Sequence, residues 1–279
     1  MLNLAIVVAE VVAGLWGSSM ALLADAGHNL SDVLSLAVAW GAGALAARPP
    51  SARYTYGLKS SSILAALSNA ALLFVALGAI LIESLRRLAE PAASHGGVMM
   101  AVAGAGIVIN TGSALLFAAR AKDDLNMRAA FQHLMADAVV SAGVVLAGLA
   151  VWYTSWSWID PVTSLIITAV IGWGSWGLLR ESLDMALLAV PAGIDQARVR
   201  DWLAAQPGVS AVHDLHIWPM STTETALTAH LVMPGGHPGD DALHALAETL
   251  AADFAIGHVT VQVETGTGPD CALHSDGVV

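Results

Sequence analysis

The sequence predicts a membrane-embedded, all-α bundle of six helices, followed by a small cytoplasmic α+β domain. The chain has 279 residues, of which 56% are hydrophobic and only 12% charged, with a mean hydropathy of +0.68. Soluble domains usually carry about 25% charged residues. Six long apolar segments fill the first two thirds of the chain, and the last third alternates between helix-like and strand-like patterns.

The six apolar segments are candidates to span a bilayer, whose hydrocarbon core of roughly 30 Å needs about 20 helical residues. Turn-forming residues such as Gly, Pro and Ser separate them. The first segment is short and starts without a basic region, so we expect no cleavable signal peptide and a short missing cytoplasmic leader. We place the spans at residues 1–16, 20–45, 61–86, 96–119, 129–154 and 161–188.

Basic residues near the span ends set the orientation. Seven fall on the side that carries both termini and two on the opposite side, which predicts cytoplasmic termini. The first group is Arg48, Arg53, Lys59, Arg120, Lys122, Arg128 and Arg180, and the second is Arg86 and Arg87. Together with the high Ala and Gly content, this suggests a bacterial inner (plasma) membrane.

The last third reads as a helix, two strands, a helix and a strand. Alternating segments such as "SAVHDLHIW", "TALTAHLVM" and "HVTVQVE" predict the strands, and "DALHALAETLAADF" predicts the second helix. This αββαβ order predicts a small ferredoxin-like domain with helices on one face of a sheet. We therefore expect a transmembrane domain at 1–190, a cytoplasmic domain at 191–265 and a flexible tail at 266–279.

The charge is concentrated in this last third. Residues 191–279 hold 11 acidic and 2 basic side chains, a net charge of −9, and seven of the ten histidines lie in the last 67 residues. An acidic surface excludes nucleic acid as a partner, because phosphate binding needs basic residues, and it attracts cations instead. With a single cysteine, an intrachain disulfide framework is excluded.

Two spans each carry a histidine and an aspartate four residues apart. His28 and Asp32 lie on one face of the second span, and His133 and Asp137 repeat the spacing in the fifth. Charged side chains within a bilayer are unfavourable by roughly 2.5–3.5 kcal/mol each. Two imidazoles and two carboxylates are the number and type of ligands that tetrahedral Zn²⁺ takes, and the bound ion would offset that penalty.

Other polar residues in the spans have a simpler interpretation. Single buried Asp, Glu or Asn residues often form hydrogen bonds between packed helices. We therefore assign Asp25, although it precedes His28 by one turn, to a supporting structural role, together with Glu10, Asn110 and Asp160. The ligand set contains no thiolate or thioether, which argues against Cu(I).

The chain resembles the cation diffusion facilitator family over nearly its whole length. The similar segments are "SSMALLADAGHNLSD", "RYTYGLKSSSILAALSNA", "NMRAAFQHLMADAVVSAG", "WIDPVTSLIIT" and "VHDLHIW". The resemblance implies a homodimeric exporter in the lipid bilayer that exchanges cytosolic divalent metal ions for protons, with a metallochaperone-like cytoplasmic domain. It also assigns transport to His28, Asp32, His133 and Asp137, with Zn²⁺ as the preferred ion. Because imidazole titrates in the physiological pH range, we expect the two histidines to carry the protons, with Asp32 or Asp137 contributing.

The resemblance further implies metal ligands in the cytoplasmic domain, where Zn²⁺ would be regulatory. His213 and His230 match positions used in the family, and plausible further ligands are His244, His258, Glu264 and Cys271. We leave out His216, because residues three apart on a regular strand face opposite sides.

Three alternatives remain at this point. The ligand types also allow a broader exporter of Cd²⁺, Co²⁺, Ni²⁺ or Fe²⁺, since selectivity depends on geometry as well as on donor type. A membrane metal sensor that does not transport would use the same ligands. A metalloenzyme is disfavoured, because four protein ligands leave a tetrahedral ion no open position for a substrate.

Overall fold

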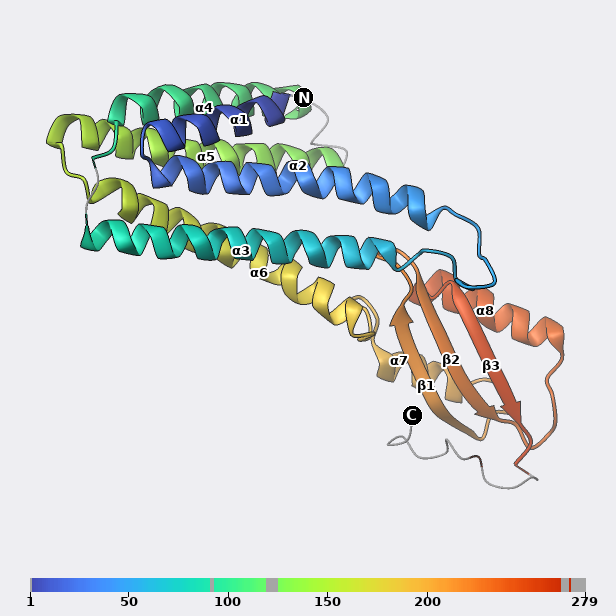
Figure 1. The fold of residues 1–279 in the computed structure, drawn as a ribbon. Coiled ribbons are helices and arrows are strands. Elements are labelled where there is room, and N and C mark those ends of the chain that lie inside the picture. Colours follow the sequence, from blue (N-terminus) through green and yellow to red (C-terminus); the bar gives the residue numbers. More distant parts are fainter. Residues whose placement is uncertain (1, 91–92, 119–124, 267–270, 272–279) are drawn as a thin grey trace. The chain divides into compact units, whose positions relative to one another are not determined.

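The computed structural model describes residues 2–90, 93–118, 125–266 and 271. Its first part consists of six helices, which Figure 1 shows as long coils. Five of them are long and apolar enough to cross a membrane, and the first is shorter. The helices are α1 (Leu2–Trp16), α2 (Met20–Ala46), α3 (Ser61–Ala89), α4 (Gly96–Ala118), α5 (Leu125–Thr154) and α6 (Ile159–Ala186). The predicted spans match them, although α5 begins four residues earlier.

Contacts divide the chain into two compact units that cut across the helices. The first comprises Met1–Ala37 and Asn69–Gly177, and the second comprises Val38–Ser68 and Leu178–Val279. The end of α2, the start of α3 and the end of α6 thus belong with the C-terminal residues. This division differs from the sequence-based boundary at residue 190, and residues 267–270 and 272–279 of the predicted tail lie outside the described part.

In the first unit, α4 and α5 pack with their backbones almost in contact. A Cβ atom on Gly96 would lie 2.3 Å from the carbonyl oxygen of Gly148, and one on Gly148 would lie 2.9 Å from that of Gly96. Only glycine fits at such a crossing, where small residues let membrane helices approach closely. Around it, Met99, Ala103 and Val144 belong to the buried apolar core of the unit.

The start of α2 is capped by a residue from another helix. Asp160, at the beginning of α6, is 1% exposed, and its carboxylate accepts hydrogen bonds from Ser19 Oγ at 2.6 Å and from the backbone N–H groups of Met20 at 2.7 Å and Ala21 at 3.2 Å. The first N–H groups of a helix lack partners within the helix, and a carboxylate there also suits the helix dipole. The structural role predicted for Asp160 is thereby confirmed.

The second unit contains the α+β domain in the predicted αββαβ order. Its elements are α7 (Gln196–Ala204), β1 (Ala211–Pro219), β2 (Thr225–Val232), α8 (Asp240–Phe254) and β3 (His258–Glu264). The sheet has the order β1-β2-β3, with β2 antiparallel to β1 and parallel to β3. Both helices add apolar residues to one core with the sheet, including Val199, Leu203, Leu246 and Leu250.

A β-bulge interrupts β1 and changes which side chains share a face. His213 pairs with His230, but the next paired residue, His216, stands opposite Thr228, so three steps on β1 match two on β2. Asp214, inside the bulge, has φ = 50°, in the left-handed region that few residues other than Gly, Asn and Asp adopt. Because of the bulge, His213 and His216 lie on the same face of the sheet.

The loop between α2 and α3 packs on the strand ends within the second unit. Lys59 forms an ion pair with Glu224, and Ser62 Oγ accepts a hydrogen bond of 3.1 Å from the backbone N–H of Thr222. The ring of Tyr56 meets that of His258 edge to face, with centroids 5.4 Å apart. Two contacts from this loop and one from Ser62, in the first turn of α3, thus lie against the β1–β2 turn and the start of β3.

Candidate metal centres

Helices α2 and α5 bring the four residues predicted for transport together in the first unit. Asp32 Oδ2 lies 3.7 Å from His28 Nε2 and 3.3 Å from His133 Nε2. Asp137 lies 3.4 Å from His28 Nε2 through Oδ1 and 3.7 Å from His133 Nε2 through Oδ2. Each imidazole therefore faces both carboxylates, and we call these four residues the membrane quartet.

The members of the membrane quartet differ in their access to the surroundings. Asp137 is buried, with 6% of its side chain exposed, whereas half of the His133 side chain is accessible. His28 and Asp32 lie between these extremes. The two imidazole rings are 6.0 Å apart and inclined at 73°, so they approach the carboxylates from different directions. One side of the quartet is thus open and the other is closed by packed helices.

Supporting polar residues lie one turn away from the membrane quartet. Asp25 is fully buried and accepts a hydrogen bond of 3.1 Å from Ser141 Oγ on α5. Glu10, also fully buried, accepts one of 3.0 Å from Asn29 Nδ2. Asn29 was not singled out by sequence reasoning, although its position next to His28 on a helix with several polar residues was a signal. Asn110 on α4 is buried as well.

The second group of candidate ligands lies on the sheet, on the face opposite the helices. His213 and His230 are direct cross-strand partners with ring centroids 4.9 Å apart. Glu264, at the end of β3, contacts His213 Nε2 at 3.1 Å and His230 Nδ1 at 2.9 Å through its two carboxylate oxygens. Cys271 Sγ lies 3.6 Å from His230 Nδ1. We call these four residues the sheet cluster.

The donors of the sheet cluster are close enough for one ion. One ligand atom from each of the four residues lies within 4.8 Å of the others, and both histidines are buried. Burial opposes ionisation of Glu264, but hydrogen bonds from His213, Cys271 and Gln262 outweigh it and hold the pKa of that carboxyl below its usual value of 4.5. The carboxylate is therefore ionised at neutral pH, which is the form that binds metal.

Asp214 supports the sheet cluster from outside, a role that sequence reasoning missed. Its carboxylate lies 3.4 Å from His230 Nε2 through Oδ2 and 2.9 Å from His216 Nε2 through Oδ1. A carboxylate on the second nitrogen of an imidazole fixes the tautomer and the ring orientation. His216 stays outside the cluster, but the prediction assumed a regular strand, and the bulge puts His216 on the same face as His213.

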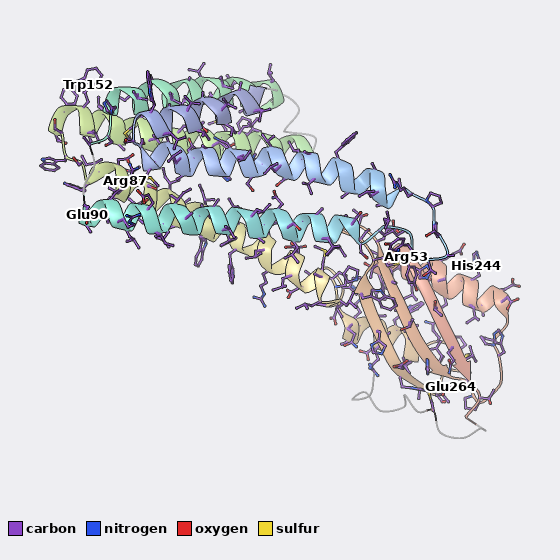
Figure 2. The ribbon with its side chains drawn as sticks, viewed as in Figure 1. Arg53, Arg87, Glu90, Trp152, His244 and Glu264 are labelled. Carbon is purple, nitrogen blue, oxygen red and sulfur yellow. The ribbon has the colours of Figure 1, made fainter. Side chains whose placement is uncertain are left out.

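Two of the predicted ligands lie away from the sheet cluster. His244 is on the exposed side of α8, 3.3 Å from Glu248, and Figure 2 shows it well separated from Glu264. His258 begins β3 and Glu264 ends it, so at about 3.3 Å per residue the two are roughly 20 Å apart. The structure thus brings together His213, His230, Glu264 and Cys271, and leaves His244 and His258 elsewhere.

Comparison with known families gives matches over nearly the whole chain. Residues 1–187 match the cation efflux transmembrane domain, and residues 191–266 match the cytoplasmic domain of cation efflux proteins. These two matches meet between α6 and α7.

Curated relatives of similar length are found in several bacteria. The cation efflux system protein CzcD of an Alcaligenes strain is 36% identical over 92% of this chain and 82% of its own. The zinc transporter ZitB of Escherichia coli is 35% identical over 95% of this chain and 86% of its own. A cadmium, cobalt and zinc/H(+)-K(+) antiporter of Bacillus velezensis is 31% identical over 92% of this chain and 83% of its own.

Proposed function

Because the chain belongs to the cation efflux family of membrane transporters, also known as cation diffusion facilitators, we propose that it exports cytosolic Zn²⁺ in exchange for protons. The membrane quartet is the transport site. Divalent metal efflux follows from the family, whereas zinc preference, proton exchange and the assignment of His28, Asp32, His133 and Asp137 are the parts that we propose.

The spacing of donors in the membrane quartet carries the proposal. Donor atoms around a tetrahedral ion with bonds of about 2.0–2.2 Å lie about 3.3–3.6 Å from one another. The four N···O separations in the quartet are 3.3, 3.4, 3.7 and 3.7 Å. His28, Asp32 and Asp137 each offer a ligand atom within 4.8 Å of the others, and His133, whose ring centre lies 6.0 Å from that of His28, would have to move closer to complete a tetrahedral site. Two imidazoles with two carboxylates suit Zn²⁺ better than Mg²⁺ or Mn²⁺.

Charge balance supports exchange against protons. With Zn²⁺ bound to neutral imidazoles, the two positive charges of the ion balance Asp32 and Asp137. When the ion leaves, a proton on each of His28 and His133 restores the same balance, and both imidazoliums face both carboxylates. Since metal ligands must be deprotonated, protons and Zn²⁺ compete for the site, and a proton gradient can drive export.

The sheet cluster is proposed as a second, regulatory zinc site on the cytosolic side. Imidazole, carboxylate and thiolate are all zinc ligands. We further propose that both termini lie in the cytoplasm, that the protein sits in a bacterial inner membrane, and that it works as a homodimer. Metal bound to the cytoplasmic domain would shift the population of conformations towards those that bind it better.

The direct test is zinc transport in proteoliposomes under a pH gradient. Asp32→Ala and His133→Ala are expected to abolish metal-driven proton flux, while Glu181→Gln, an exposed carboxyl on α6, serves as the matched control. Transport at the wild-type rate by either quartet variant would show that the site assignment is wrong. A zinc transport rate that does not depend on the pH gradient would instead refute proton exchange.

A broader exporter is the second candidate, since a relative that is 31% identical is named for cadmium, cobalt and zinc. Softer or differently coordinated ions would use the same donors. A competition panel of Zn²⁺, Cd²⁺, Co²⁺, Ni²⁺ and Fe²⁺ separates the two. Equal inhibition of zinc uptake by the other ions would favour the broader function, and binding without transport would favour a sensor.

A further inference from the structure

A second buried polar group lies beside the membrane quartet. It consists of Glu10 on α1, Asp25 and Asn29 on α2, and Ser141 on α5. Both carboxyls have an exposed fraction of 0%. Each accepts one hydrogen bond from a neutral donor, Glu10 from Asn29 at 3.0 Å and Asp25 from Ser141 at 3.1 Å.

Around these two carboxyls, helices α1, α2 and α4 supply no permanent positive charge, and His28 on α2 is the ionisable base that acts on both. The remaining oxygens, Glu10 Oε1 and Asp25 Oδ1, are buried without a hydrogen-bond partner among the described residues. Helices α1, α2 and α4 contain no lysine or arginine. An isolated ionised carboxylate is strongly unfavourable in such surroundings, and two neighbouring ones repel each other, so the group is stable only if one of them is neutral.

The position of Glu10 identifies it as the one that holds the proton. A Cβ atom on Gly106 would lie 3.2 Å from Ser141 Oγ and 3.7 Å from Glu10 Oε1, so this oxygen points to the α4–α5 side, near the hydroxyl that already bonds Asp25. A protonated Glu10 supplies an O–H donor to a group of acceptors. Asp25 keeps its charge more readily, since it receives the serine hydroxyl and lies one turn from His28.

We propose that Glu10 is a proton-binding site separate from the metal ligands, and that it gives up its proton when Zn²⁺ enters the membrane quartet. This inference rests on the proposed exchange of zinc for protons. The ionisable groups that act on Glu10 are Asp25 and His28 from α2 and Asp137 from α5, and α4 contributes none. Once His28 and His133 have lost their protons, the arriving ion adds two positive charges between His28 and Asp137. These charges favour ionised Glu10, so its proton leaves to solvent as the metal binds.

The experiment measures protons on the purified full-length protein in lipid nanodiscs. In weak buffer, Glu10→Gln is expected to bind as much Zn²⁺ as the wild type but to release about one proton fewer per ion. Infrared difference spectra on zinc addition are expected to lose the carbonyl band of a protonated carboxylic acid in the wild type, and to show no such change in Glu10→Gln. Glu181→Gln, the exposed control, should behave as the wild type in both measurements.

Equal proton release by wild type and Glu10→Gln, or an unchanged infrared band, would overturn the inference. Should Glu10→Gln not fold, Asp25→Asn tests the same proposal. Without the neighbouring negative charge, Glu10 is expected to lose its proton at a lower pH, and the carbonyl band of the metal-free protein should disappear at that lower pH. A band whose pH dependence is unaffected would also refute the proposal. This band is recorded without metal, so a failure of zinc transport and a failure of proton binding at Glu10 are distinguishable.

Discussion

The two candidate metal centres share imidazole and carboxylate donors, to which the sheet cluster adds the sulfur of Cys271, but they hold them in different ways. The membrane quartet joins two helices, and its N···O separations of 3.3–3.7 Å are longer than good hydrogen bonds. The sheet cluster is built on paired strands, and Glu264 contacts both histidines at 2.9–3.1 Å. A loosely paired site between helices suits a cargo that must leave, whereas a site already fixed by strand pairing suits a bound ion that stays.

The largest expected effect comes from changing the donor type in the membrane quartet. Replacing both His28 and His133 with Asp leaves only carboxylates, which suit Mn²⁺ better than Zn²⁺. Zinc transport is expected to fall at least about tenfold, with a gain in Mn²⁺ transport measured in the same proteoliposomes. Unchanged preference for Zn²⁺ would mean that the imidazoles do not select the ion.

The sheet cluster should affect bound metal more than transport. His213→Ala is expected to remove one zinc ion per chain, as measured by metal analysis of purified protein, while transport falls by less than about tenfold because the quartet is intact. His244→Ala is the matched control, since this histidine is exposed on α8. If both variants retained all bound zinc, the sheet cluster would not be a metal site.

Outside both centres, Asp160→Asn should destabilise the helix bundle. The amide loses the charge that three donors share and presents its own N–H groups to them, which is expected to lower the free energy of unfolding by about 1–3 kcal/mol. Thermal unfolding in detergent measures the change. Asp184→Asn, at an exposed position on the same helix, should have almost no effect.

The smallest effect concerns pH and the cytoplasmic domain. Hydrogen bonds lower the pKa of Glu264, so the folded state favours its ionised form; this contribution is fully present above the ordinary pKa of 4.5 and is lost as the pH falls through the lower, folded value. Hydrogen exchange of the β2 and β3 amides should therefore speed up in acid. Glu264→Gln should show less of this pH dependence, and an identical profile would contradict the assignment.

The sequence was sufficient for elements that depend on local periodicity. The six apolar segments and the αββαβ order follow from local spacings, and the observed helices and strands confirm them. The His-x-x-x-Asp spacing brings the two side chains of each pair to within 3.7 Å on α2 and on α5. The sheet cluster was only partly predictable. Cross-strand pairing of His213 with His230 depends on register. His258 was placed among the ligands because "HVTVQVE" resembles the closing strand of the family, but His258 and Glu264 are opposite ends of that strand.

Long-range features were beyond the sequence for a physical reason. The bulge at Asp214 requires a left-handed backbone that non-glycine residues seldom signal, and it alone decides the face of His216. Likewise, the hydrogen bonds from the start of α2 to Asp160 join residues 140 positions apart. Such contacts are set by how helices pack, which no local pattern encodes.

The close approach of α4 and α5 at Gly96 and Gly148 predicts which covalent cross-links between helices would block transport. With Gly96 and Gly148 in close backbone contact, sliding of one helix past the other would produce clashes, so we expect α4 to move together with α5, which carries His133 and Asp137. A covalent cross-link between α4 and α5 should therefore leave the transport rate unchanged. On the proposed transport site, a cross-link between α2 and α5 should arrest transport, because it joins the two helices that hold the proposed ligands.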